Sequence, residues 1–329
     1  MNWQGKKVMV TGAGGFIGSH LVERLVTLGA QVRALVHYNS RNSWGLLELL
    51  AEEVKTRIEV FPIDITDPYT VSQAMAGHTV VFHLAALISI PYSYIAPSYY
   101  LAVNCGGTLN LLEAARSQGV ERFVHTSTSE TYGTAQYTPI DEGHPLKGQS
   151  PYAAIKIGAD MLAQSYYLSF GVPVATIRPF NTYGPRQSAR AIIPTIISQG
   201  LSGEVIRLGN LTSVRDLNYV TDTVAGFIKI AESPQAVGEL INIGSGSALT
   251  VGELAEKIVA MLGGNKQIIS DEERYRPPQS EVMELLCDAR KAKNLLGWEP
   301  RVKLEDGLAQ TIAFIREHLD HYKPRLYNI

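Results

Sequence analysis

The sequence predicts an α/β fold, built on a doubly wound parallel sheet and followed by a smaller C-terminal α/β lobe. A short apolar strand at 7–12 runs through a glycine-rich turn into a helix at 17–28. Strands then alternate with helices up to about residue 126, which requires crossover connections and a parallel sheet covered on both faces. The length of 329 residues exceeds what one core usually supports, so a second lobe is expected.

The remaining elements follow from apolar spacing and turn residues. Further strands are expected at 31–36, 58–63, 79–84 and 121–126, with helices near 68–76 and 98–118. Later helices are expected at 250–262, opened by the capping-box pair Thr250 and Glu253, and at 288–296. We therefore assign 1–180 to a dinucleotide-binding domain, to which later segments return, and 181–329 mainly to a substrate-binding lobe.

Composition and charge narrow the class of partner. The net charge of −2 and the pI near 6.5 provide no basic face for nucleic acid or an anionic membrane. Cys105 and Cys287 are far apart without metal-ligand spacing, so we expect buried free thiols, no metal site and no disulfide framework. The N-terminus lacks an apolar leader, and no run of about 18 apolar residues follows. A cytoplasmic protein is expected, with neither nucleic acid nor a membrane as its partner.

Glycines stand at 12, 15 and 18, between the first strand and the first helix. Glycine allows a tight turn and lets a pyrophosphate approach main-chain N–H groups, while the helix N-terminus adds partial positive charge. Strand, glycine triplet and helix in this order are typical of a Rossmann dinucleotide site. The residues expected to contact the dinucleotide are Gly12, Gly15, Phe16, Ile17 and Gly18.

The tip of the second strand, 36–41, carries no carboxylate that would bind an adenosine ribose. Its polar residues Asn39, Ser40 and Arg41 are suited to a 2′-phosphate, which favours NADP over NAD. The alternative is that Arg41 is only a solvated loop residue. Further cofactor contacts are expected at the carboxyl ends of the third and fourth strands, at Asp64, Ile65, Leu84, Ala85 and Ala86.

Tyr152 and Lys156 are four residues apart on a predicted helix and therefore share one face. A lysine ammonium beside the phenol, together with a cationic nicotinamide, favours the phenolate and makes the tyrosine a base near neutral pH. In the polar run 126–133, Thr128 is expected to hydrogen-bond a substrate hydroxyl and Glu130 to act as a second base. Ordinary turn capping by these two residues is the alternative.

These motifs resemble the extended short-chain dehydrogenases/reductases that act on nucleotide sugars. The resemblance covers nearly the whole chain and is carried by TGAGGFIG, HLAA, Asn104, STSETYG, YAAIK, RPFNTYGPR (178–186), RDLNYVTD (215–222) and GWEP (297–300). It implies a catalytic core of Thr128, Tyr152 and Lys156, and a homodimer formed through two helices of each subunit. The nucleotide-sugar contacts that it implies are Ser89, Asn181, Arg190, Arg215 and Arg276. For Asn181, Arg215 and Arg276, a turn residue and surface ion pairs are the alternative.

The residues after Thr128 distinguish the reactions of this family. Simple 4-epimerases have small residues where Glu130 stands, whereas in 4,6-dehydratases the glutamate removes the C5 proton, water leaves from C6, and the stored hydride returns to C6. Dehydratases usually place an aspartate acid where this chain has Ser129, and an alcohol is a poor proton donor at pH 7. The Thr-Ser-Glu order is also the pattern of UDP-glucuronate decarboxylases, which lose carbon dioxide and need no such acid.

The C-terminal stretch favours the dehydratase. Residues 275–282, Asp288 and the run 291–298 resemble GDP-mannose 4,6-dehydratases. Together with the other motifs, the chain most resembles the GDP-N-acetylglucosamine 4,6-dehydratases of bacterial legionaminic acid biosynthesis. The resemblance thus implies an NAD(P)-dependent nucleotide-sugar 4,6-dehydratase, with UDP-glucuronate decarboxylase and then 4-epimerase as alternatives. Some proteins of this fold sense NADP without turnover, but they generally lack the Tyr–Lys pair that is intact here.

Overall fold

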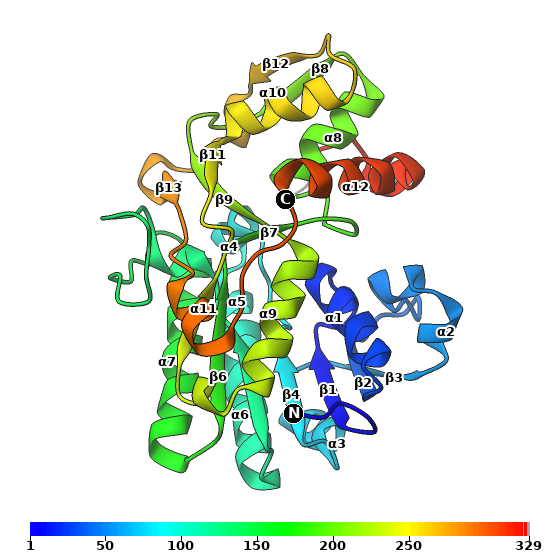
Figure 1. The fold of residues 1–329 in the computed structure, drawn as a ribbon, viewed down its shortest axis with the longest axis vertical. Helices are drawn as coiled ribbons and strands as arrows, with labels where there is room; N and C mark the ends of the chain where they lie inside the picture. The colour runs from blue at the N-terminus through cyan, green and yellow to red at the C-terminus, as the bar shows by residue number, and fades with distance from the viewer. Residues whose placement is uncertain (325, 328–329) are drawn as a thin grey trace.

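The computed structural model describes residues 1–324 and 326–327, and Figure 1 shows their arrangement. The first part of the chain contains β1 (Lys7–Thr11), α1 (Phe16–Thr27), β2 (Gln31–His37), α2 (Glu52–Lys55), β3 (Ile58–Ile63), α3 (Pro68–Met75), β4 (Val80–His83), α4 (Ile90–Ile95), α5 (Pro97–Tyr100), the π-helix η2 (Leu101–Gly106), α6 (Gly107–Gln118), β5 (Arg122–Thr126), α7 (Pro151–Phe170) and β6 (Val174–Pro179). The rest contains β7 (Asn181–Tyr183), α8 (Ile192–Ser202), β8 (Val205–Leu208), β9 (Val214–Tyr219), α9 (Val220–Glu232), β10 (Leu240–Ile243), β11 (Ala248–Thr250), α10 (Val251–Met261), β12 (Gln267–Ser270), β13 (Glu284–Leu285), α11 (Arg290–Leu296) and α12 (Leu304–Glu317).

A seven-stranded sheet in the order β10-β6-β5-β4-β1-β2-β3 forms the larger part of the molecule. Every neighbouring pair in it is parallel, which confirms the predicted doubly wound α/β fold. The strand order reverses between β1 and β4. In open parallel sheets such a reversal creates a crevice at the carboxyl ends of the strands, where ligands bind.

The two faces of this sheet are buried by different helices. Along β1, Val8 and Val10 belong to one apolar cluster, which also contains residues of α1 and α9, while Met9 belongs to the opposite cluster with residues of α3, α6 and α7. This alternation follows from the two-residue repeat of a strand. Because helices cover both faces of the sheet, a ligand can reach it only at the loops that follow the strands.

The helix expected at 98–118 is interrupted by the π-helix η2. A π-helix inserts an extra residue per turn and often marks a functional position. Here Asn104 is buried and its amide bonds both main-chain groups of Leu87, accepting from the N–H at 2.8 Å and donating to the carbonyl at 2.9 Å. These bonds hold the loop that follows β4.

The second lobe, in the upper part of Figure 1, combines a small sheet with three helices. Strands β11, β9 and β13 form this sheet with β7 beside β9, and β8 pairs with β12. Helices α8, α10 and α12 pack around them, and α10 begins with the predicted capping box of Thr250 and Glu253. After much of this lobe has been built, β10 returns to the large sheet and pairs with β6.

The described residues also bear on membrane-spanning helices, metal ligands and the two thiols. None of the described helices has the length and apolar character needed to cross a membrane. Within the described ranges, no group of three or more His, Cys, Asp or Glu side chains could hold a metal ion. Both thiols are free, and Cys287 is buried as expected, whereas Cys105 is only partly buried.

Candidate functional site

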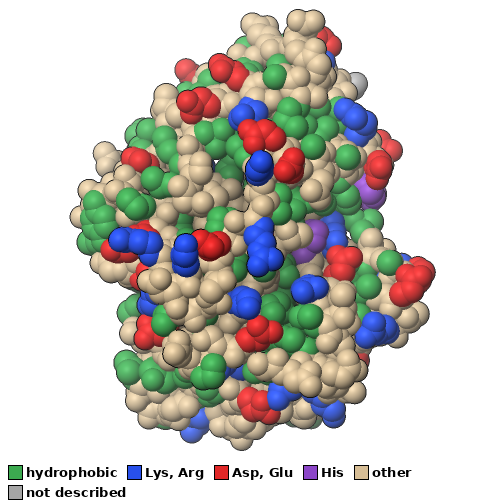
Figure 2. Space-filling model, in the orientation of Figure 1, with side chains coloured by type: hydrophobic (Ala, Val, Ile, Leu, Met, Phe, Trp, Pro, Cys, Tyr) green, Lys and Arg blue, Asp and Glu red, His purple; other side chains and the backbone are tan. Residues whose placement is uncertain are grey.

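A cavity of about 1010 Å³ lies at the carboxyl ends of the strands, between the large sheet and the second lobe. It extends from the glycine turn, past the ends of β4 and β5 and the start of α7, to β8 and the C-terminal segment of the chain. Several Lys and Arg side chains lie across the middle of the face seen in Figure 2. Of the described residues that line the cavity, only Glu130 and Glu281 are acidic. The cavity therefore suits an anionic ligand.

The glycine turn fits a pyrophosphate. Helix α1 begins after Gly15 with no side-chain cap and no acidic residue in its first turn, and Phe16, Ile17 and Gly18 line the cavity. A Cβ atom on Gly18 would lie 2.1 Å from the Gly12 carbonyl oxygen, so the turn and helix approach as closely as backbone allows. The first N–H groups of this helix have no side-chain cap and belong to residues of the cavity wall, so they are available for an anion.

The loop after β2 is held by its own hydrogen bonds. The Asn39 amide donates to the carbonyls of His37 (3.2 Å) and Ser43 (2.9 Å) and accepts from the N–H groups of Arg41 and Ser43. Asn39 and Arg41 line the cavity as predicted, and Ser43 lines it as well. The Asn39 side chain thus orders the loop, while Arg41 is left as its cationic group.

Three predicted cofactor residues lie away from the cavity wall. Ser40 is not among the residues that line it, and neither are Asp64 and Ile65. Asp64 is exposed and accepts hydrogen bonds from the N–H (2.9 Å) and the hydroxyl (2.8 Å) of Thr66, whereas Ile65 is buried in the core against Gly107. Asp64 and Ile65 follow β3, which is the edge strand of the sheet. This strand lies two strands from the point where the strand order reverses.

The predicted residues after β4 do line the cavity. The Thr11 hydroxyl accepts hydrogen bonds from the N–H groups of Leu84 (3.1 Å) and Ala85 (3.0 Å), and Ala86 follows in the same segment. A Cβ atom on Gly12, which has φ of 66°, would lie 2.8 Å from the Ala85 nitrogen. The loop after β4 and the glycine turn therefore form one continuous wall.

Helix α7 brings Tyr152 and Lys156 to the cavity. Ser150 caps this helix by accepting from the Ala153 N–H at 3.1 Å, and proline at 151 occupies its first turn. Both Tyr152 and Lys156 are buried and both line the cavity. Lys156 Nζ donates to the Thr126 carbonyl oxygen at 2.6 Å.

Burial dominates the ionisation of this pair. It raises the pKa of Tyr152, against which a hydrogen bond with Thr128 acts in the lowering direction. Burial also lowers the pKa of Lys156, and the Asp160 carboxylate opposes that shift. The protein alone therefore holds Tyr152 as a phenol, and a bound cation is needed to favour the phenolate.

A group of charges lies beside Thr128. Glu130 Oε2 is 4.0 Å from Arg276 Nη1, which is 3.8 Å from Glu281 Oε1, and Glu281 also pairs with Arg215 at 3.3 Å. Arg276 Nη1 is buried, and no described group hydrogen-bonds it. Ser129 is buried but still lines the cavity. The two predicted arginines thus lie together on the wall with Glu130, and one keeps a donor for a ligand.

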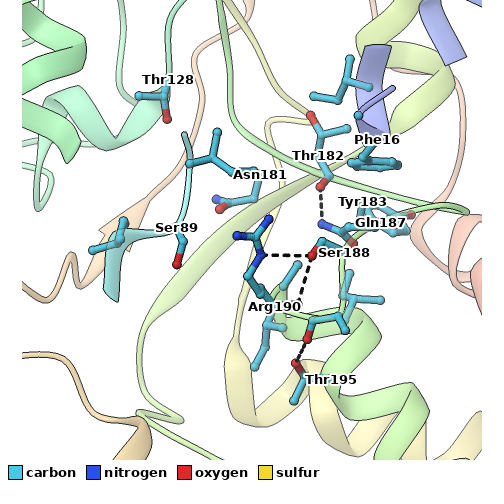
Figure 3. A pocket seen from close by; sticks show the side chains of 18 of the residues that line it. Phe16, Ser89, Thr128, Asn181, Thr182, Tyr183, Gln187, Ser188, Arg190 and Thr195 are labelled. Atoms are coloured by element: carbon cyan, nitrogen blue, oxygen red, sulfur yellow. Dashed lines mark hydrogen bonds between the residues drawn. The ribbon is translucent and has the colours of Figure 1, made fainter. Parts of the chain in front are cut away.

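The other predicted substrate residues converge on the same pocket. Figure 3 shows Ser89, Asn181 and Arg190 pointing into it from three separate segments. Ser89 caps α4, and Arg190 Nε donates to the Ser188 hydroxyl at 3.2 Å. The Asn181 Nδ2 atom is buried without a hydrogen-bond partner among the described residues. An unpaired buried donor at this wall fits an anionic or oxygen-rich ligand.

The cavity wall also contains residues that no sequence motif identified. They include Ser43, Trp44, Gln187, Arg207, Arg274 and Tyr327. Arg274 lies over the ring of Tyr327, 4.6 Å from its centroid, so the C-terminal segment helps to form the far end of the cavity. Most of these residues lie in loops or short turns, and Arg207 lies in the short strand β8. Only Gln187, beside the 178–186 motif, carried a usable signal.

Fold and site together define an enzyme of the extended short-chain dehydrogenase/reductase class. Residues 9–311 match the family model described as GDP-mannose 4,6 dehydratase, and the chain belongs to this family. A dTDP-glucose 4,6-dehydratase from Actinoplanes is 35% identical, covering 94% of this chain and 98% of its own. A UDP-glucose 4-epimerase from Mycolicibacterium smegmatis is 34% identical, with the same coverage of 94% and 98%.

A solved structure of a nucleotide-sugar enzyme is also similar to this chain. The dTDP-glucose 4,6-dehydratase DesIV from Streptomyces venezuelae, whose crystal structure contains NAD, has a TM-score of 0.85 and 30% identity, covering 97% of this chain and 99% of that one. This chain is therefore a member of a nucleotide-sugar-modifying family with a nicotinamide dinucleotide as its class of cofactor. The relatives include dehydratases, epimerases and decarboxylases.

Proposed function

We propose that this protein is a nucleotide-sugar 4,6-dehydratase that acts on GDP-N-acetylglucosamine. The observation that carries the proposal is the position of Glu130 on the cavity wall, where its N–H donates to the Thr128 hydroxyl and its carboxylate lies 4.0 Å from Arg276 Nη1. An epimerase that only removes and returns hydride at C4 needs Tyr152 and Lys156 but no second base. A carboxylate beside them provides the base that an elimination requires.

Each of the active-site residues has its own role in the proposed reaction. Tyr152 takes the proton of the C4 hydroxyl while Thr128 hydrogen-bonds that oxygen. The Lys156 ammonium, together with a cationic nicotinamide when it is bound, favours the phenolate. The glycine turn and the loop after β4 would hold a nicotinamide dinucleotide, which would supply the hydride acceptor and donor for the sugar carbons. The C4 ketone acidifies the C5–H bond, and Glu130 takes that proton. Since Ser129 is a poor acid, Glu130 itself, or a water beside it, delivers the proton to the departing C6 oxygen.

The proposed nucleotide-sugar contacts come from both parts of the molecule. Arg215, Arg276 and Arg190 provide positive charge for the diphosphate, and Asn181 provides an unpaired amide donor. Ser89, which lies at the same pocket (Figure 3), is assigned to the sugar. The guanine base rests on the resemblance of 275–282, Asp288 and 291–298 to GDP-mannose 4,6-dehydratases. The N-acetyl group rests on the resemblance of these segments taken together with the other motifs. We accordingly assign 181–329 mainly to nucleotide-sugar binding and 1–180 to the dinucleotide.

NADP is the proposed cofactor. The cavity wall near the tip of β2 is formed by Asn39, Arg41, Ser43 and Trp44, without a carboxylate among the described residues that line it. A carboxylate would repel a 2′-phosphate, whereas Arg41 attracts it. The glycine turn and the loop after β4 would hold the pyrophosphate and the nicotinamide half.

We further propose a cytoplasmic homodimer formed through α6 and α7. These helices pack against each other and expose apolar side chains: Leu109 (39%) on α6, and Met161 (46%) and Leu168 (71%) on α7. Met161 and Leu168 are seven residues apart and so share one face of the helix. An exposed apolar strip on two adjacent helices fits a self-complementary interface.

UDP-glucuronate decarboxylation is the second candidate, and Ser129 favours it. The loss of carbon dioxide from a β-keto acid needs no acid at a leaving hydroxyl, so an alcohol at this position would suffice. Arg276, with its unpaired buried donor, would then bind the substrate carboxylate.

One mass-spectrometric screen tests both candidates. The purified protein is incubated with NADP or NAD and each of the UDP, GDP, CDP and dTDP sugars. GDP-N-acetylglucosamine is expected to give a product whose mass is lower by one water. A carbonyl reagent should react with the C4 ketone of this product. Carbon dioxide loss from UDP-glucuronate would transfer the assignment to the decarboxylase, and an isomer of unchanged mass would indicate an epimerase.

A further inference from the structure

A buried charged cluster lies behind Lys156, and the mechanism above does not use it. Asp160 follows Lys156 by one turn of α7, and its side chain is 2% exposed. Its carboxylate is hydrogen-bonded to His125 Nε2 at 2.9 Å and accepts from the Ser127 hydroxyl at 2.5 Å and from Arg178 Nη2 at 2.8 Å. Arg178 is 1% exposed and also donates to Ser127 from Nε, at 3.0 Å.

This cluster keeps Asp160 ionised. Burial alone would raise the pKa of its carboxyl, but the hydrogen bond from His125 and the charge of Arg178 hold that pKa well below its usual value. The Arg178 guanidinium lies over the Tyr132 ring, 4.5 Å from its centroid. A buried ion pair often contributes less stability than apolar side chains of similar volume. The core alone therefore gives no reason for this pair.

The cluster is connected to the site through the end of β5. His125 and Ser127, two residues apart, both bind Asp160. The residues that follow each of them serve the site, since the Thr126 carbonyl accepts from Lys156 Nζ and Thr128 is hydrogen-bonded to Tyr152. Movement of the strand end would displace both contacts together.

Asp160 is also the anion closest in sequence to Lys156 on this helix. The titratable and charged groups that interact electrostatically with Lys156 are Asp160 on α7, His83 on β4, His125 on β5, Arg178 on β6 and Cys105 on η2. Tyr152 lies one turn earlier on the same face of α7. Burial lowers the pKa of both histidines and raises that of the Cys105 thiol and the Tyr152 phenol, so all four are neutral near pH 7. Asp160 and Arg178 are then the charged groups of this set.

We propose that Asp160 is a positioning residue of the active site. It ties the end of β5 to α7, which places the Thr126 carbonyl and the Thr128 hydroxyl, and its negative charge keeps Lys156 an ammonium against the nearby Arg178. The role of Lys156 in catalysis rests on the proposed function, but the charge on Lys156 can be measured without any substrate.

The direct test is competitive acetylation of the cofactor-free protein with acetic anhydride over a range of pH. Peptide mass spectrometry gives the pH midpoint at which the Lys156 amine becomes reactive, with an exposed lysine, Lys303, as the internal reference. In Asp160→Asn, the midpoint of Lys156 is expected to fall by about one pH unit or more, because an opposite charge is lost while Arg178 remains. In Arg178→Gln, the midpoint is expected to rise.

Asp222→Asn is the matched control. Asp222 is a buried aspartate that accepts from the main-chain N–H groups of Arg301 and Val302 at 2.9 Å, far from α7 in the sequence. Its loss should lower stability and leave the Lys156 midpoint unchanged. If Asp160→Asn and Arg178→Gln fold and leave the midpoint at its wild-type value, the proposal is wrong. If only one of the two folds, the sign of its shift decides.

A second measurement uses whichever nucleotide sugar the wild-type protein converts. In Asp160→Asn the alkaline limb of the kcat profile should move to lower pH, and Asp160→Glu should restore its position in part. A role limited to stability would lower kcat by the same factor at every pH and would refute the electrostatic role. If no nucleotide sugar is converted, the proposed function fails, while the acetylation result still decides the role of Asp160.

Discussion

Replacing Gly18 with alanine tests whether the glycine turn is the cofactor cradle. The new Cβ atom would lie 2.1 Å from the Gly12 carbonyl oxygen and 3.0 Å from the Ala13 Cα atom, and both belong to backbone. The turn cannot easily retreat, because the Ala13 N–H bonds the Leu35 carbonyl at 3.1 Å and Gly12 closely approaches Ala85. The start of α1 must therefore shift by roughly 1 Å to reach an ordinary contact distance.

The shift of α1 is expected to lower both the stability of the protein and its affinity for the cofactor. Overpacking of this kind costs about 1–3 kcal/mol of stability. Two main-chain N–H bonds to a pyrophosphate, at about 1.5 kcal/mol each, correspond to about 3 kcal/mol of binding energy. Their loss weakens NAD(P) binding by roughly 100-fold, since about 1.4 kcal/mol is tenfold.

Isothermal titration calorimetry with NADP and NAD measures the affinity, and thermal unfolding measures the stability. Gly106→Ala is the matched control, because Gly106 lies in η2 and a Cβ atom there would meet nothing closer than the Leu101 carbonyl oxygen at 3.9 Å. That variant should bind cofactor like the wild type. Wild-type affinity in a folded Gly18→Ala protein would refute the assignment of the pyrophosphate to this turn.

Four other changes test separate parts of the molecule. Glu130→Gln keeps the shape of the side chain but cannot take the C5 proton, so dehydration should slow by about 10²–10⁴-fold while reduced nicotinamide still forms; full turnover would exclude Glu130 as the base. Arg41→Ala should weaken NADP at least about tenfold more than NAD in a calorimetric titration, and equal losses would count against a 2′-phosphate contact. Leu168→Glu should convert the dimer to a monomer in analytical ultracentrifugation, and an unchanged mass would place the interface elsewhere. Burial, aided by Arg186, lowers the pKa of His20 from 6.5 to about 4, so the folded state prefers the neutral ring and loses stability as pH falls below about 6.5. Urea unfolding should show a loss of about 2 kcal/mol between neutral pH and about pH 5 that His20→Gln removes, and an equal loss in that variant would refute it.

Local spacing predicted the parts of the site that one stretch of chain determines. The strand, glycine turn and helix stand where expected, because glycine conformation and helix-end charge are local properties. Tyr152 and Lys156 face one cavity because their spacing is a property of any helix. The order of strands across the sheet confirmed the fold class as well.

The sequence could not supply what depends on position across the sheet or on packing between distant segments. Asp64 and Ile65 follow a strand, as cofactor residues often do, but β3 lies at the sheet edge and these residues do not reach the cavity. The pairing of Arg215 with Glu281 joins residues that are 66 apart in the sequence. Likewise, burial of Tyr152 sets the direction of its pKa, which the helix spacing alone did not reveal.

The late return of β10 has a consequence for synthesis. In a nascent chain that ends at residue 180, β6 is an edge strand, with a border of unpaired N–H and C=O groups. Its neighbour in the sheet, β10, is encoded about 60 residues downstream. Such a border recruits other strands, so the partly made protein is open to misassembly until residues 240–243 leave the ribosome. Neither part of the molecule is therefore an independent module, and a fragment cut at the lobe boundary should aggregate.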